Sequence, residues 1–287
     1  MGLTARHFFS LDAAACDPHV ESEFFAGLRM RNGTFKLTRP SRFAELDEAF
    51  SSVIAERATQ LRSVLDVGAS SGITTIDLAE FLRRQGVSAT ITATDLFVRA
   101  HLIDAGPTAR ILTDADGWPL QYDIGGVAVR PWIRRLDYLT LACIPRLVAR
   151  RLVQRRAKAV IERGESRVVA LVSPRLARRD DVEMVEDDIM QRTRSFARRF
   201  DLVRAANVLN RNYFPTRHLE HAIDNIGSYL RGPGALFLVT RTNRERENAG
   251  TLFELDQSRT FRAIARVGGG SEIEALVAGR TSDIREA

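Results

Sequence analysis

The fold is predicted by one stretch of the sequence, Val64-Leu-Asp-Val-Gly-Ala-Ser-Ser-Gly-Ile-Thr-Thr-Ile-Asp-Leu-Ala-Glu-Phe-Leu82. Its first residues form a short apolar run, which is typical of a parallel strand buried on both faces. Gly68 and Gly72 permit positive φ and let a ligand approach the backbone closely. An amphipathic segment follows, and a helix there directs its first N–H groups toward the turn. The stretch therefore predicts a strand, a glycine turn and a helix.

A second apolar segment, 89–95, ends in an acidic residue. At this distance from a glycine turn, the carboxylate of Asp95 is placed to accept hydrogen bonds from a ribose diol. A dinucleotide site requires the spacing G-x-G-x-x-G, whereas this turn has Gly68, Ser70 and Gly72 with no third glycine before the helix. The residues indicate a nucleoside cofactor and disfavour a nicotinamide-dependent dehydrogenase.

The turn resembles motif I of the class I S-adenosylmethionine-dependent methyltransferases. The resemblance implies a Rossmann-like α/β fold, with a doubly wound, mostly parallel seven-stranded sheet whose last strand is antiparallel. It also implies S-adenosylmethionine as cofactor. The residues expected to contact this cofactor from the first two strand ends are Asp66, Gly68, Ala69, Ser70, Gly72, Asp95 and Leu96. For Asp66, either fixing the turn or meeting the cofactor's ammonium group is compatible with its position.

Two later segments resemble further landmarks of that family. Residues 182–190 match the third strand and its acidic exit, where Asp188 and Ile189 are expected to meet adenine and Asp187 is the alternative. Residues 200–209 match the fourth strand. Asn207 at its end is expected near the cofactor, and Asn207 and Tyr213 are the candidates to line the reaction centre. The resemblance covers about residues 45–110 and 180–278.

The spacing of these landmarks predicts a domain organisation with an insertion. About 85 residues separate the second strand from the third, where one helix suffices in the minimal family pattern. We therefore expect a methyltransferase core formed by 45–97 and 181–287, an N-terminal cover segment at 1–44, and an inserted cap at 98–180. Within the cap, Asp116-Gly117 indicates a hairpin turn.

The inserted cap is strongly basic. The net charge of the 287-residue chain is +6, and residues 130–163 contain nine arginines and Lys158 against two acidic residues. From Pro145 onward, the apolar residues Ala149, Val153, Ala157 and Val160 recur at helical spacing, which predicts a basic amphipathic helix. A lid or dimer surface, an anionic membrane surface, and an acidic partner or substrate remain alternative roles for it. The helix lacks the interleaved aromatic residues that single-strand binders use, so nucleic acid is not favoured.

Composition limits the remaining classes. The two cysteines are too few for a disulfide framework or zinc site, and no histidine spacing predicts a metal. No apolar run reaches the length of a membrane span, and the first residues lack a signal-peptide core. We expect a cytoplasmic protein.

The expected activity is methyl transfer to a small molecule or metabolite. The sulfonium of the cofactor already activates the methyl group, so the protein chiefly aligns the acceptor with it. No general base can be assigned from the sequence. A non-catalytic module that binds S-adenosylmethionine or S-adenosylhomocysteine, and an enzyme acting on RNA or a membrane-associated substrate, are the alternatives.

Overall fold

A computed structural model of the chain describes residues 2–12, 15–36, 40–133, 137, 143–243, 245 and 247–281. The chain divides into two compact units, one formed by 1–39 and 97–175, and the other by 40–96 and 176–287. The sequence predicts 1–44 and 98–180 as separate segments, whereas the structure groups most of both in the first unit. We call these the N-terminal unit and the sheet unit.

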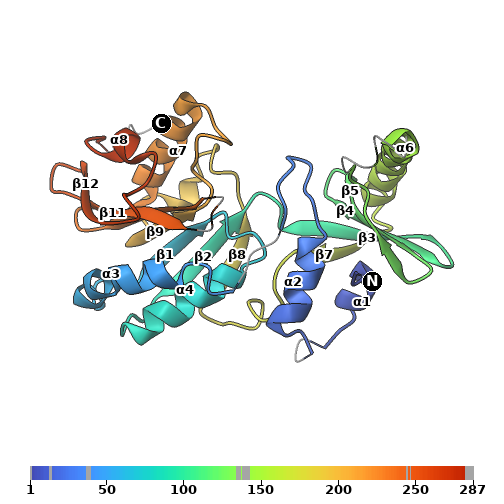
Figure 1. The fold of residues 1–287 in the computed structure, drawn as a ribbon, viewed down its shortest axis with the longest axis horizontal. Helices are drawn as coiled ribbons and strands as arrows, with labels where there is room; N and C mark the ends of the chain where they lie inside the picture. The colour runs from blue at the N-terminus through green and yellow to red at the C-terminus, as the bar shows by residue number, and fades with distance from the viewer. Residues whose placement is uncertain are drawn as a thin grey trace. The chain divides into compact units, whose positions relative to one another are not determined.

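The sheet unit contains a seven-stranded sheet and the helices that cover it (Figure 1). Its strands are β1 (Ser63–Val67), β2 (Thr90–Asp95), β8 (Val182–Glu186), β9 (Leu202–Ala206), β10 (Leu236–Thr242), β11 (Asn248–Leu255) and β12 (Phe261–Val267). Its helices are α3 (Ala44–Glu56), α4 (Ile73–Arg84), η1 (Arg194–Phe196), α7 (Thr216–Tyr229) and α8 (Glu274–Val277). The predicted strand, turn and helix of the opening stretch correspond to β1, the turn at 68–72 and α4.

The sheet order is β12-β11-β10-β9-β1-β2-β8. The pairings from β10 through β9, β1 and β2 to β8 are all parallel, and β11 pairs antiparallel with both β10 and β12. The prediction of a Rossmann-like, mostly parallel seven-stranded sheet whose last strand pairs antiparallel is confirmed.

Two apolar layers enclose this sheet because successive strand residues point to opposite faces. Leu65 and Val203 pack into a cluster with α7, whereas the adjacent Val64 and Leu202 pack into a second cluster with α3 and α4. The strands are apolar on both sides for this reason, as expected for parallel strands between helices. The carboxyl ends of the central strands are thus held in a rigid, fully packed sheet.

The N-terminal unit contains an antiparallel five-stranded sheet of order β6-β5-β4-β3-β7. Its strands are β3 (Arg99–Gly106), β4 (Ala109–Asp114), β5 (Pro119–Ile124), β6 (Val127–Val129) and β7 (Arg167–Ala170), and its helices are α1 (Ala5–Phe8), α2 (Pro18–Ala26) and α6 (Cys143–Glu162). The predicted turn at Asp116-Gly117 lies between β4 and β5. Gly117 has a φ of +77°, and a Cβ there would lie 2.8 Å from the carbonyl oxygen of Gln154, so the glycine lets α6 approach the turn.

The basic helix predicted after residue 145 is α6. Its inward face contains Ala157, which is buried, and Val153, which is half-buried. Leu152, another apolar residue of this helix, is 56% exposed. Arg150 is half-buried and contacts Trp118. The helix therefore has an arginine among its inward-facing residues. Among the described residues, no helix is long and apolar enough to cross a membrane.

The N-terminal segment is attached to this unit by an aromatic cluster and an ion pair. Phe8 stacks on Phe24 with ring centroids 3.9 Å apart, and both are buried. Glu21 of α2 is fully buried, and its carboxylate accepts hydrogen bonds from Ser173 and Arg175. These contacts join α1 and α2 to the segment that follows β7.

Candidate functional site

The strands β1, β2, β8 and β9 end at one edge of the seven-stranded sheet. The residues predicted to bind the cofactor lie at these strand ends. The register aligns Val67 of β1 with Thr94 of β2 and with Ala205 of β9, and Thr94 with Val185 of β8. The chain passes from β1 to β2 on one side and returns as β9 on the other. This reversal of strand order is where ligands bind in open α/β sheets, outside the carboxyl ends of the strands.

The turn after β1 has a left-handed backbone at three positions. The φ angles are +72° at Gly68, +58° at Ser70 and +82° at Gly72. The amide of Ala69 donates to the carbonyl of Thr94 (2.8 Å), which fixes the turn against β2. A Cβ at Gly68 would lie 2.0 Å from a methyl group of Val208, and one at Gly72 would lie 2.3 Å from Leu176. A side chain at either position would be strained by the positive φ and would force Val208 or Leu176 to shift.

Asp95 faces this turn from the end of β2. Its Oδ2 accepts a hydrogen bond from the backbone N–H of Ser70 at 3.0 Å, which joins the two residues that the sequence placed in one site. The next residue, Leu96, is 43% exposed. The carbonyl of Asp95 also accepts a hydrogen bond from the amide of Asp187, so the ends of β2 and β8 are in contact.

The acidic exit of β8 is half-buried at the same edge. The Oδ1 of Asp188 accepts a hydrogen bond from the amide of Met190. Asp187, the alternative adenine contact, accepts a hydrogen bond from the hydroxyl of Thr193, and burial raises its pKa above the ordinary value. The side chain of Ile189 packs in the core beside α7, and its carbonyl accepts a hydrogen bond from the Nδ2 of Asn225 in α7 at 2.8 Å.

The two candidates for the reaction centre differ in their surroundings. Asn207 has a φ of +60°, and its Oδ1 accepts a hydrogen bond from the amide of Thr242 at 2.7 Å. Its Nδ2 lies 3.5 Å from the hydroxyl of Thr242, so both polar atoms of this side chain face β10. Tyr213 is 60% exposed. Asn207 therefore anchors the loop after β9, and Tyr213 lies on the surface of that loop.

Asp66 is held by Arg204, a partner that the motifs of the sequence do not indicate. Arg204 of β9 donates from Nε and Nη2 to the two carboxylate oxygens, at 2.8 and 2.7 Å. The hydroxyl of Thr75 in α4 donates to Oδ2 at 2.6 Å. The sequence signal for this partner was a charged residue in the middle of an otherwise apolar strand, which requires a buried counter-charge.

A third buried charge lies near this pair on α3. Burial raises the pKa of Asp47 to about 6, whereas the positive charge of Arg204 acts in the opposite direction. The sheet unit thus contains a cluster of buried acidic and basic side chains beneath the glycine turn. Its members are Asp47, Asp66 and Arg204.

Comparison with known proteins finds no matching family model and no matching curated protein. Solved structures are similar at low identity. An O-methyltransferase family protein from Burkholderia thailandensis is 17% identical, with 71% of this chain and 41% of that chain covered and a TM-score of 0.31. The amino pentose methyltransferase CalS10 from Micromonospora echinaspora is 10% identical, with 74% and 63% covered and a TM-score of 0.33. A S-adenosylmethionine-dependent methyltransferase from Clostridium acetobutylicum is 11% identical, with 83% and 82% covered and a TM-score of 0.33.

This chain spans less than two thirds of the length of the first two of these structures. With TM-scores of 0.31 to 0.33, the similarities carry no argument about activity.

Proposed function

We propose that the chain is an S-adenosylmethionine-dependent methyltransferase that acts on a small-molecule acceptor. The observation that carries the proposal is the hydrogen bond between the Asp95 carboxylate and the backbone N–H of Ser70. It sets an acidic group from β2 against the left-handed turn after β1. A carboxylate at this position suits a ribose, whose two hydroxyl groups are hydrogen-bond donors.

The charge at the edge fits this cofactor better than a dinucleotide. Asp95, Glu186, Asp187 and Asp188 bring four acidic side chains to the ends of two paired strands. Such a cluster repels the two phosphates of a dinucleotide and attracts a ligand that carries sulfonium and ammonium groups. The acidic side chains at this edge therefore favour a cofactor that has an adenosyl group and no phosphates.

Each predicted residue then has a distinct role. Gly68, Ala69, Ser70 and Gly72 shape the methionine side, and Asp66 acts indirectly because Arg204 and Thr75 already engage its oxygens. Asp95, with Leu96 beside it, holds the ribose. Asp188 and Ile189 meet adenine.

The cofactor, when bound, supplies a methyl group that is electrophilic without further activation. The protein is left to position the acceptor and exclude water. Asn207, tied to Thr242, fixes the loop whose far end presents the Tyr213 phenol. The sequence after β9, Asn207-Val-Leu-Asn210, lacks the proline pair of exocyclic-amine methyltransferases. The acceptor that we propose is a small molecule or metabolite with a carboxylate or hydroxyl group.

The first test is calorimetric titration with S-adenosylhomocysteine. We expect the wild type to bind, and Asp95→Asn to bind at least about ten-fold more weakly, because a hydrogen bond to a charged group contributes about 1.5–3 kcal/mol. Glu183→Gln is the matched control, since Glu183 is an exposed carboxylate on the neighbouring β8. Preferential binding of NAD, or no binding of either cofactor, contradicts the proposal.

Acceptor screening separates the enzyme from a binding module. Transfer of a radiolabelled methyl group to a carboxylate- or hydroxyl-bearing metabolite is the expected result. Binding of S-adenosylhomocysteine without transfer to any small molecule, RNA or membrane fraction favours a non-catalytic module.

A specific observation on α6 favours a second role, contact with an anionic membrane. Ile144, Val148 and Leu152 are 59%, 52% and 56% exposed and recur every four residues, so they form an apolar stripe. Arg151 and Arg155 are exposed on the same side of the helix. An apolar stripe flanked by arginines matches the chemistry of an anionic lipid surface.

Liposome sedimentation tests this role. We expect the protein to sediment with vesicles that contain phosphatidylserine and not with phosphatidylcholine vesicles, and binding to weaken as salt is raised. Val148→Asp should abolish sedimentation, whereas Glu162→Gln at the end of the same helix should not. Equal binding to both vesicle types contradicts this role.

A further inference from the structure

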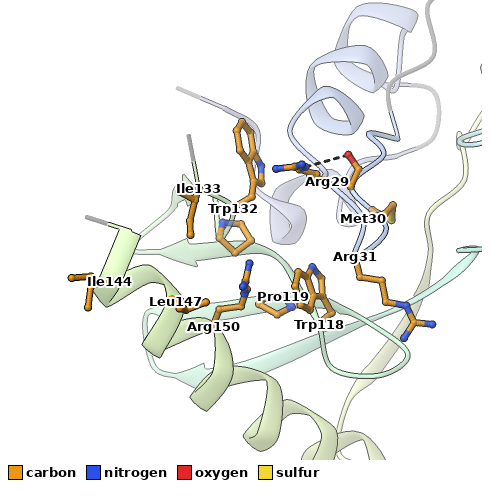
Figure 2. A pocket seen from close by; sticks show the side chains of 12 residues that line it. Arg29, Met30, Arg31, Trp118, Pro119, Trp132, Ile133, Ile144, Leu147 and Arg150 are labelled. Carbon is orange, nitrogen blue, oxygen red and sulfur yellow. Dashed lines mark hydrogen bonds between the residues drawn. The ribbon is translucent and has the colours of Figure 1, made fainter. Parts of the chain in front are cut away.

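The N-terminal unit contains a pocket of its own, with a volume of about 470 Å³ (Figure 2). Four segments of this unit form its walls: the hairpin at 29–33, the start of β5, the residues after β6, and the first turns of α6. The lining side chains are mainly of two kinds, aromatic or apolar residues and arginines. No residue of the candidate cofactor edge belongs to this lining.

Tryptophan side chains supply a large part of the pocket wall. Trp118 and Trp132 are the only tryptophans of the chain, and both line the pocket. Phe35 packs edge-on against Trp132, with ring centroids 5.4 Å apart. Ile144 and Leu147 of α6 add aliphatic surface. These walls suit a ligand with a flat or apolar body.

Three arginines line the pocket, and Arg29 and Arg150 differ from Arg31 in the groups that they contact. The guanidinium of Arg150 lies over the Trp118 ring, 4.5 Å from its centroid, and that of Arg29 lies 5.8 Å from the Phe35 centroid. Figure 2 shows both side chains pointing into the space beside the tryptophans, whereas Arg31 turns away. Arg31 forms ion pairs with Asp114 and Asp116.

Among the described residues, Arg29 and Arg150 have no such acidic partner. Within the part of the chain that the structure describes, no carboxylate lies at ion-pair distance from either guanidinium; the Nε of Arg29 donates only to the carbonyl of Gly33, at 3.2 Å. Both residues are half-buried. Half-buried positive charges without a counter-ion, held by stacking on aromatic rings, form a preorganised site for an anion.

We propose that this pocket binds an organic anion, a carboxylate or phosphate ester attached to an aromatic or apolar body. The anion pairs with Arg150 and Arg29, and the body packs against Trp118, Trp132 and Leu147. Arginine suits this role because its planar fork binds carboxylate and phosphate groups while it remains stacked on a ring. The inference does not depend on methyl transfer.

Intrinsic fluorescence provides a direct test, because both tryptophans of the chain line the pocket. The full chain is titrated with 4-tert-butylbenzoate, with the neutral 4-tert-butylbenzamide, with phenyl phosphate and with inorganic phosphate. We expect the benzoate to change tryptophan emission and to bind at least about ten-fold more tightly than the amide, the ratio that one charge-assisted hydrogen bond produces. The phenyl phosphate arm shows which anionic group is preferred.

Variants of two consecutive arginines on α6 locate the site. Arg150→Gln should weaken binding of the benzoate about ten-fold or more and leave that of the amide nearly unchanged. Arg151→Gln is the matched control, because Arg151 is exposed and does not line the pocket. Thermal unfolding of each variant reports whether the unit remains folded, and Arg29→Gln repeats the measurement on the opposite wall.

Several outcomes overturn the proposal. Equal affinities for benzoate and benzamide remove the anion selectivity, and inorganic phosphate binding as tightly as phenyl phosphate removes the role of the apolar walls. Equal losses of benzoate affinity in Arg150→Gln and Arg151→Gln would show that the benzoate interacts with the overall positive charge of α6 and not with the pocket. Failure of all four probes to bind at millimolar concentration also contradicts the site. None of these results bears on S-adenosylhomocysteine binding, so the two proposals fail independently.

Discussion

Asp66 and Arg204 are register partners on the adjacent parallel strands β1 and β9, and they form a two-fold hydrogen-bonded ion pair. Both side chains are almost completely buried, with exposures of 1% and 2%. Arg204 also donates to the carbonyl of Thr74 at 2.9 Å. The pair therefore connects two central strands to the first turn of α4, immediately beneath the candidate cofactor edge.

Breaking this ion pair should strongly destabilise the sheet unit. Arg204→Met leaves the Asp66 carboxylate buried with only Thr75 as its side-chain donor, and loss of one member of a buried pair costs about 3–5 kcal/mol. The free energy of unfolding is measured by urea denaturation followed by far-ultraviolet circular dichroism.

The double variant Asp66→Asn/Arg204→Met is the control for this prediction. It removes both charges, and asparagine still accepts the hydrogen bond from Thr75, so it should be more stable than Arg204→Met alone. Equal stability of the single and double variants would show that the uncompensated charge is not the cause.

The raised pKa of Asp47 predicts a defined pH dependence. The folded protein holds this proton up to about pH 6, whereas the unfolded chain releases it near the ordinary value of 3.8. The folded state therefore binds more protons in this interval, and the contribution of Asp47 to stability falls as the pH rises from about 4 to 6. The loss is complete about one pH unit above the folded-state pKa and is on the order of 2–3 kcal/mol.

Asp47→Asn tests this linkage. The variant should be more stable than the wild type at neutral pH, and the difference should shrink as the pH is lowered toward 4. Glu48→Gln, an exposed neighbour on α3, should leave the pH profile unchanged. A constant difference between Asp47→Asn and the wild type across this interval is the contrary result.

The close approach of Val208 to the glycine turn predicts unequal effects of two alanine substitutions. Gly86→Ala also introduces a side chain at positive φ, but nothing lies within 4 Å of its Cβ, so it should cost about 1–2 kcal/mol. Gly68→Ala adds a steric conflict with Val208 and should cost at least about 1 kcal/mol more.

Chemical denaturation measures both Gly68→Ala and Gly86→Ala. Val208→Ala introduced into the Gly68→Ala background should recover most of the difference between them. If the two single variants are equally stable, Val208 moves aside without cost and the packing argument is wrong.

The buried carboxylate of Glu21 should be essential to the N-terminal unit. It accepts hydrogen bonds from the Ser173 hydroxyl at 2.5 Å and from Arg175 Nε and Nη2 at 2.9 and 2.7 Å. Glu21→Gln removes the charge at this buried position, and we expect a loss of about 3 kcal/mol. Tryptophan emission follows the unfolding, since both tryptophans lie in this unit.

The matched variant for Glu21 is Glu23→Gln, an exposed carboxylate on the same helix. It should change stability by less than about 0.5 kcal/mol, as is usual for surface positions. A similar effect of both substitutions would mean that α2 contributes little to the unit.

The sequence predicted much of the sheet unit. The apolar runs, the glycine turn and the acidic residue after the second strand are local patterns, and local patterns determine strand and helix identity. Because parallel strands place their carboxyl ends at one edge, the meeting of Asp95 with the turn at Ser70 was also predictable. The expected strands, and the positions of Asp95 and Ser70, agree with the structure.

The N-terminal unit was less predictable. Its hairpin turn at Asp116-Gly117 and the basic helix followed from local signals. The grouping of residues 1–39 with 97–175 did not follow from local signals. It depends on contacts such as that between Glu21 and Arg175. Residues far apart in the chain leave no periodic signal of their pairing.

The sequence by itself determined the α/β class, the strand that bears the glycine turn, and the edge where a nucleoside is expected. Only the tertiary structure decided that Arg204 neutralises Asp66 and that Arg29 and Arg150 meet beside the two tryptophans. The physical reason is the range of the interactions. Hydrophobic periodicity and turn chemistry act over a few residues, whereas a buried ion pair or a pocket wall requires side chains that the completed fold brings together from more than 100 positions away.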